Sequence, residues 1–332
     1  MQVRWMEIRA VVIIGGIALL LAAVVAVVVA SRNRQQPAPP PDVLVSPCPA
    51  DVRVKAVERK PEPSDREIVE ASTAVAVVCG ADATTADRYE ARNDALRSIA
   101  RRRDLPEKDV AALIAYLRTA DNAMRVERVA ALKNDVMNLL RNQDPPPKDL
   151  AGTLIGIFEG GKHPPVVIDY CIQHLGAMLD ELDEKGRLRV RAVLAKAAKR
   201  TKQPYAGTAL YSLAEDARAT PAQDKELKGL ALALCKSEAN HAARIAAIQL
   251  AGERGFADAL PILRESLSAT SRDAVLDIAA IGSVGLLGDV DDIPLVESVA
   301  ARGGRRYAVA ANAAIERIKN RVARPSEGAG VR

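Results

Sequence analysis

The side chains best suited to nucleophilic or metal chemistry are sparse in this sequence. Its 332 residues contain four cysteines and three histidines, His163, His174 and His241. Cys171 and His174 form a C-x-x-H pair one helical turn apart, so both could face one metal ion from a helix. A zinc site needs further ligands, and no other side chain has the required spacing. We therefore expect Cys171 and His174 to be packing residues, with the imidazole partly exposed, and we expect no metal and no cofactor.

Three short motifs resemble functional sequences only in part. Residues 281–285 read Ile-Gly-Ser-Val-Gly, but a nucleophile elbow has glycine first and follows a strand, whereas this segment has helical periodicity. Residues 160–162 read Gly-Gly-Lys and lack the rest of a phosphate-binding loop. Asp289, Asp291 and Asp292 match too few positions of a calcium loop and fit helix caps better. We expect no catalytic site.

The most informative pattern is an internal repeat near the C-terminal end. At an offset of 33 residues, Ala247, Gly255, Asp258 and Pro261 recur as Ala280, Gly288, Asp291 and Pro294. A unit this short cannot bury its apolar face alone, so neighbouring units must stack. The repeat therefore predicts an α-solenoid.

Helical periodicity extends this pattern back to residue 85. First helices are expected near 86–103, 124–142, 165–181, 204–217, 239–252, 271–287 and 303–321, and second helices start near 107, 147, 185, 221, 258 and 291. The interval between second-helix starts shortens from about 40 residues to 33 along the chain. A coiled coil is disfavoured, because no heptad pattern persists and proline interrupts every stretch. The fold class is all-α, with little or no sheet.

The last units carry a family resemblance. The residues that match are Arg244, Ala247, Leu250, Gly255, Asp258, Pro261 and Leu263, then Ala280, Gly285, Gly288, Asp289, Asp291, Pro294 and Leu295. The segment 240–318 resembles the HEAT-like repeats named after phycobilisome lyases, although Asp277 replaces the arginine of the second unit. The resemblance implies an α-solenoid of stacked helical pairs, and it says little about function, because the motif encodes packing.

A membrane anchor is expected at the N-terminus. Residues 10–30 contain no charge and are long enough to span a bilayer as a helix. The alternative is a cleaved signal peptide, but the apolar run is longer than such signals use. Two arginines and the amino group precede the apolar run, and two arginines follow it. This small excess of positive charge on the N-terminal side favours a cytoplasmic N-terminus and a body outside the cytoplasm. We expect a single-pass inner-membrane protein with a periplasmic repeat domain.

The expected domain order follows from these features. Residues 1–9 form a short basic tail, 10–30 the transmembrane helix, 31–63 a Pro-rich linker, 64–321 the helical-repeat domain and 322–332 a disordered tail. The first helix of the repeat domain should run from a capping box at Ser64 and Glu67 to about Val78, before Gly80.

The cysteines give one further expectation. Cys48 and Cys79 flank a short segment and could form a disulfide in an oxidising compartment. Cys171 and Cys235 lie in helical patterns, where small buried hydrophobic side chains are expected.

Charge supplies the candidate binding surface. The net charge is +5, but the excess lies at the two ends and the stretch between them is negative, so no nucleic-acid partner is expected. The basic C-terminal end contains Arg302, Arg305, Arg306, Arg317, Lys319, Arg321 and Arg324. It could bind an acidic partner or lipid headgroups, or it could be a solvated capping helix. The function expected is a non-catalytic, membrane-tethered scaffold for an unidentified protein partner. The alternatives are a structural component of an envelope complex, or a lyase-type subunit acting on a chromophore-bearing protein.

Overall fold

The structure is a computed structural model that describes residues 65–81, 84, 86–236, 238–269 and 273–323. The predicted tail, membrane span and linker at residues 1–63 lie outside the described residues, as do Cys48 and Arg324. Within the described ranges, no helix combines the length and apolarity needed to cross a bilayer.

The described chain is all-α, as predicted. It forms fourteen α-helices and two short 3-10 helices, and its described residues include no strand. The opening helix is α2 (Asp65–Val78). The first helices of successive pairs are α3 (Tyr89–Ile99), α5 (Val126–Arg141), α7 (Pro165–Ala177), α9 (Tyr205–Ala214), α11 (His241–Glu253) and α13 (Ala274–Leu287), followed by α15 (Arg305–Ala323). The second helices are α4 (Glu107–Arg118), α6 (Leu150–Gly160), α8 (Glu184–Ala198), α10 (Pro221–Leu234), α12 (Leu260–Ser268) and α14 (Ile293–Gly303). The 3-10 helices η1 (Ala257–Ala259) and η2 (Val290–Asp292) lead into α12 and α14.

Local signals explain most helix boundaries. Thr220 caps α10 in a reciprocal capping box, in which the Gln223 side chain accepts from the Thr220 backbone N–H at 2.9 Å. α2 ends at Val78, before Gly80 at a φ of +70°, a conformation that favours glycine. The predicted start near residue 147 is early, because a turn at residues 148 and 149 delays α6 to Leu150. α15 continues to Ala323, two residues past its predicted end.

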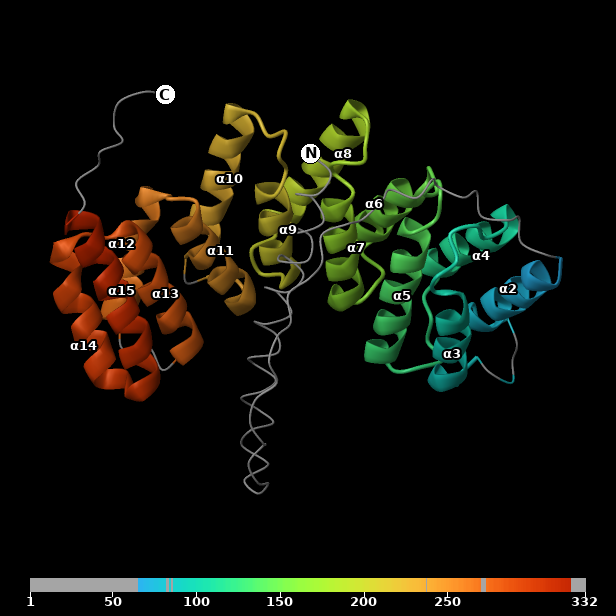
Figure 1. The fold of residues 1–332 in the computed structure, drawn as a ribbon, viewed down its shortest axis with the longest axis horizontal. Coiled ribbons are helices and arrows are strands. Elements are labelled where there is room, and N and C mark those ends of the chain that lie inside the picture. The colour runs from blue at the N-terminus through green and yellow to red at the C-terminus, as the bar shows by residue number, and fades with distance from the viewer. Residues whose placement is uncertain (1–64, 82–83, 85, 237, 270–272, 324–332) are drawn as a thin grey trace, which may run out of the picture. The chain divides into compact units, whose positions relative to one another are not determined.

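Helices pack against their neighbours in chain order (Figure 1). Each first helix contacts the first helix of the next pair, from α3 through to α15. Backbones also approach closely where the second helix of one pair meets the first helix of the next, as at α8 with α9 and α14 with α15. Every pair is therefore held by its neighbours at least as much as by its own two helices, as stacked repeats require.

Glycine sets how closely the first helices of the C-terminal half approach. A Cβ atom at Gly285 of α13 would lie 2.7 Å from the Cα of Ala314 in α15, and one at Gly252 of α11 would lie 3.0 Å from the Cα of Ser283. Both contacts are with backbone atoms of the next first helix, which cannot move aside alone. The Ser283 hydroxyl also donates to the Ile248 carbonyl at 2.8 Å, so this approach is hydrogen-bonded as well as packed.

The substitution Gly285→Ala tests this close approach. We predict a loss of about 1–3 kcal/mol in the free energy of unfolding, because the added methyl group overpacks a rigid contact. Gly282→Ala is the matched control in the same helix, since a Cβ there meets nothing within 4 Å. It should raise stability by up to ~1 kcal/mol through helix propensity. Urea unfolding followed by circular dichroism compares the two; equal effects would contradict the packing argument.

Candidate functional site

The structure divides the predicted basic end into two groups. Arg302 donates to the Leu267 carbonyl at 2.7 Å, and Arg321 donates to the carbonyls of Gly288 at 2.6 Å and Gly285 at 3.2 Å. These acceptors lie near the C-terminal ends of α12 and α13, where carbonyls lack intrahelical partners. Arg302 and Arg321 are therefore structural.

The other described cations of this end are exposed. Arg305, Arg306, Arg317 and Lys319 form no hydrogen bond or ion pair with any described residue. Arg317 and Lys319 lie toward the C-terminal end of α15, where the helix dipole stabilises positive charge. Arg305 and Arg306 occupy the first turn, where the dipole disfavours cations, and that turn contains no acidic residue. The helix dipole therefore does not account for these two arginines.

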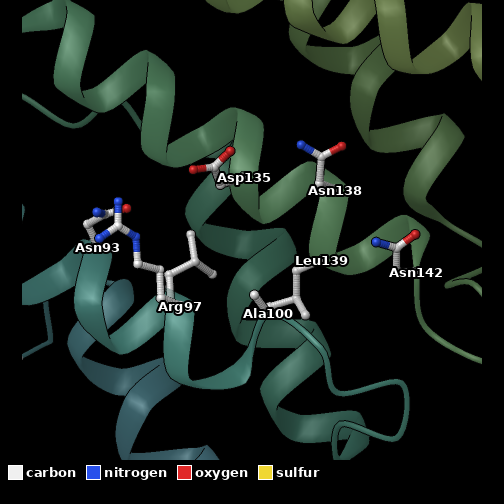
Figure 2. Close-up of a pocket in the computed structure, with 8 residues that line it drawn as sticks. Asn93, Arg97, Ala100, Asp135, Asn138, Leu139 and Asn142 are labelled. Carbon is white, nitrogen blue, oxygen red and sulfur yellow. The ribbon is translucent and has the colours of Figure 1, made fainter. Parts of the chain in front are cut away.

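A polar cleft that sequence reasoning missed lies between α3 and α5 (Figure 2). Its volume is about 140 Å³. Its lining residues are Asn93, Leu96 and Arg97 of α3 with Ala100 directly after it, and Asp135, Asn138 and Leu139 of α5 with Asn142 directly after it. The two sets have the same i, i+3, i+4, i+7 pattern, so each is one face of its helix. No sequence motif identifies these residues, because their types are common on protein surfaces. They form a cleft only because the folded protein places the two helix faces opposite each other.

A second hollow, between α8 and α9, is lined by Lys199, Arg200 and Lys202 together with Thr201, Gln203 and Tyr205. Its cations are already engaged. Lys199 pairs with Glu226 at 3.4 Å, Lys202 donates to the Glu238 carbonyl, and Arg200 lies over the Phe158 ring. The cations of this hollow therefore connect neighbouring helical pairs and are not available to bind an anion.

Asp216 is the centre of a buried ion cluster. Its Oδ2 accepts from Arg187 at 2.7 Å and from Arg191 at 2.6 Å, and the Asp216 side chain is fully buried. Burial raises the carboxyl pKa, but the bonds from Arg191, the Arg218 backbone and Arg187 outweigh it, so the pKa is lowered. The cluster joins α8 to the segment before α10 and stays charged in the folded protein.

Related acid–base contacts recur between successive second helices. Arg264 of α12 forms two hydrogen bonds with Asp292, at 2.6 and 2.9 Å, and Lys228 of α10 pairs with Asp258. Asp292 also accepts from the Asp289 backbone N–H at 2.9 Å, which confirms that this aspartate cluster caps a helix. Each aspartate lies just before its second helix, whereas its basic partner lies on the preceding second helix and was missed.

A second buried group joins α2, α3, α4 and α5. Arg92 donates to the Val78 carbonyl at 2.9 Å and pairs with Asp121 at 2.8 Å. Lys133 donates to the Leu117 carbonyl at 2.9 Å and to the Thr119 carbonyl at 2.6 Å. Burial lowers the pKa of Lys133 to about 8, with Asp121 opposing the shift. Because both cations are used against carbonyls at helix ends, this group is a structural joint.

Cys171 and His174 are packing residues, as predicted, but the imidazole is buried rather than partly exposed. His174 Nε2 lies 3.2 Å from Asn134 Oδ1 of the preceding first helix. Burial, with a smaller effect of Arg141, lowers its pKa to about 4. Cys171 and Cys235 are fully buried, and burial raises both thiol pKa values to about 12. Across the ranges that the structure covers, no three potential ligands cluster around a metal position.

The remaining predicted positions are also placed. Cys79 is half-buried, its pKa is raised to about 11 chiefly by burial, and its predicted partner Cys48 lies outside the described residues. Residues 281–285 lie inside α13, as expected from their helical periodicity. Gly160 ends α6, and Gly161 has a φ of +61°, so the Gly-Gly-Lys segment is a helix terminus.

Comparison with known proteins assigns this arrangement to no family. No protein-family model, no curated protein and no solved structure matches the chain. The molecule is an all-α protein whose helices pack in sequential pairs.

The substitution Asp216→Asn tests the buried cluster. It leaves buried Arg191 without a counter-charge and Arg187 with only the exposed Glu184, so we predict a loss of about 3–5 kcal/mol in the free energy of unfolding. Asp258→Asn is the control, because its pair with Lys228 is exposed and should contribute at most about 1 kcal/mol. Denaturant unfolding of the two variants should separate them clearly; similar losses would show that burial does not govern these contacts.

The low pKa of His174 predicts a pH dependence of stability. The unfolded imidazole binds a proton below its ordinary pKa of 6.5, while the folded one stays neutral down to about 4. Stability is therefore lost as pH falls from 6.5 to 4, by about 3 kcal/mol from this residue. His174→Gln should remove that part of the slope, seen as the difference between wild-type and variant unfolding curves over this range. Parallel curves would contradict the assignment.

Proposed function

We propose that this protein is a membrane-anchored HEAT-like repeat scaffold that binds other proteins and is not an enzyme. In this proposal, residues 10–30 are a single transmembrane helix, the Pro-rich linker holds the repeats off the bilayer, and the repeat domain lies in the periplasm. The sequence features of the N-terminus support the anchor. The sequential packing of helical pairs supports the scaffold, because stacked pairs present extended surfaces suited to polypeptide partners.

The use of the reactive side chains supports a non-catalytic role. The buried arginines, Lys133 and Asp216 bond to helix ends or to one another across pairs, and His174 bonds to Asn134. A general acid, base or nucleophile must instead face a substrate. These groups form internal hydrogen bonds and ion pairs that hold neighbouring helical pairs together.

The observation that carries the proposal is the placement of Arg305 and Arg306. They are exposed, without a described bonding partner, in a turn where the helix dipole disfavours cations. Two arginines in this turn lower stability, so their presence favours an interaction with an acidic surface on a partner protein. Arg317, on the same face three helical turns along α15, extends the positive surface.

Charge reversal tests the proposal. The double variant Arg305→Glu with Arg306→Glu should abolish a salt-sensitive capture of partner proteins from detergent-solubilised membranes, without loss of stability. The matched control reverses Lys185 and Arg189 of α8, which are also exposed and without described partners, and changes net charge equally. Partners retained by the first variant, or lost equally from both, would contradict a specific role for this end.

A further inference from the structure

The cleft between α3 and α5 presents an amide that no described residue of the protein bonds, and whose polar atoms reach the solvent. Asn93 is only 9% exposed, and its side chain forms no hydrogen bond with any described residue. Its donors and acceptor are therefore free to bond a ligand that enters the cleft. The cleft has about 140 Å³, more than the ~30 Å³ share of a water molecule in the liquid. The cleft therefore has room for a ligand larger than one water molecule, and an unbonded amide to meet it.

The polar groups of the cleft match a main chain. A side-chain amide presents one acceptor and two donors, which complements the N–H and C=O of a peptide group. Three such amides line the cleft, at Asn93, Asn138 and Asn142. The Asn142 amide is also without a described partner, and Asn138 donates only to Asp135, which leaves its carbonyl oxygen available.

The spacing along the helices fits an extended chain. Residues four apart on a helix are separated by about 6 Å along its axis. Alternate residues of an extended strand, whose peptide groups face the same way, repeat at about 6.6 Å. Asn138 and Asn142 are four residues apart at the C-terminal end of α5, and Asn93 and Arg97 are four residues apart on α3. In an extended chain lying between the two helices, the peptide groups that face α3 can therefore bond the α3 side chains, and those that face α5 can bond the α5 side chains.

The charges of the cleft decide against an anionic ligand. Arg97 and Asp135 are its two charged residues, one of each sign, and they lie at the same end (Figure 2). Leu96 and Leu139, both buried, provide apolar atoms at the base between the two helices. A phosphate or nucleic-acid ligand would need an excess of cations. An uncharged main chain with a small apolar side chain suits this lining better.

We infer that the α3–α5 cleft binds an extended peptide segment of a partner protein, chiefly through its main chain. This inference rests on the proposed scaffold function and assigns it a second contact, remote in sequence from Arg305 and Arg306. About 10 Å of each helix face lines the cleft, which corresponds to roughly three residues of extended chain.

Peptide selection on the full-length protein in detergent tests the inference. The probe is a phage-displayed library of short random peptides, and the affinity of each selected peptide is then measured by fluorescence anisotropy. Asn142→Leu and Asn138→Leu should each weaken binding about fivefold or more, the value of one lost hydrogen bond. Asn312→Leu, an exposed amide on α15, is the control and should leave affinity unchanged. N-methylation of one central peptide nitrogen should weaken binding similarly, because it removes a main-chain donor.

The outcomes separate this inference from the scaffold proposal. Peptide binding that is lost in the cleft variants and by N-methylation supports it. Failure to enrich any peptide, or binding that ignores the cleft variants, overturns it, while the charge-reversal capture experiment still decides the scaffold role. Asn93→Leu adds a check on folding: an amide with no internal partner can be replaced without lowering the unfolding midpoint, so a marked drop would show a structural role and contradict the inference.

Discussion

The carbonyl groups at helix C-terminal ends are the constraint on which this structure depends. The last carbonyls of a helix have no intrahelical donor, and a short helix buried among neighbours must find one elsewhere. Here the donors are cations from later elements: Arg92 for α2, Lys133 for α4, Arg244 for α10, Arg302 for α12 and Arg321 for α13. Arg254 likewise donates to the Ala214 carbonyl at the end of α9. Cations are also favoured at this end of a helix dipole, so bonding and electrostatics agree.

This arrangement ties each pair to the one before it. Several of these bonds join residues 33 to 40 apart, such as Arg321 with Gly288 and Arg254 with Ala214, which is the range of the repeat period itself. The glycine contacts between first helices and the acid–base contacts near second helices act over a slightly shorter separation, 28 residues for Arg264 with Asp292. Helices held by such joints use many of their buried polar side chains internally. Among the described groups that no such joint uses, those in the α3–α5 cleft and on the first turn of α15 are the ones whose placement packing does not explain.

Much of the fold could be predicted from the sequence because its signals are local. The helix periodicity, the capping box at Thr220, and the aspartates before α14 each act within a few residues, and the structure places them as expected. The period near 33 located the pairs of the C-terminal half. The sequence identified Gly285 as a position of the repeat motif. It did not predict that Gly285 approaches the backbone of Ala314, because that contact depends on how the next unit packs.

The candidate sites were less predictable, for a physical reason. Whether Arg321 is a binding residue or a structural one depends on carbonyls 33 residues away, and composition alone grouped it with Arg305. The Asn93 cleft depends on burial and on the opposition of two helix faces, neither of which a single sequence displays. His174 was expected to be partly exposed, because nothing near it in sequence shows that Asn134 and α5 cover it.

Hydrogen exchange measured by mass spectrometry on Arg321→Met tests the central claim most directly. If cation-to-carbonyl bonds hold each pair to the one before it, the variant should exchange faster in α13, α14 and α15, with protection in α3 to α9 unchanged. This is the nearest-neighbour behaviour of a stacked array. Unchanged exchange in α13 would show that the bond contributes nothing. A uniform increase from α3 to α15 would show a single cooperative unit, and either result would contradict the account.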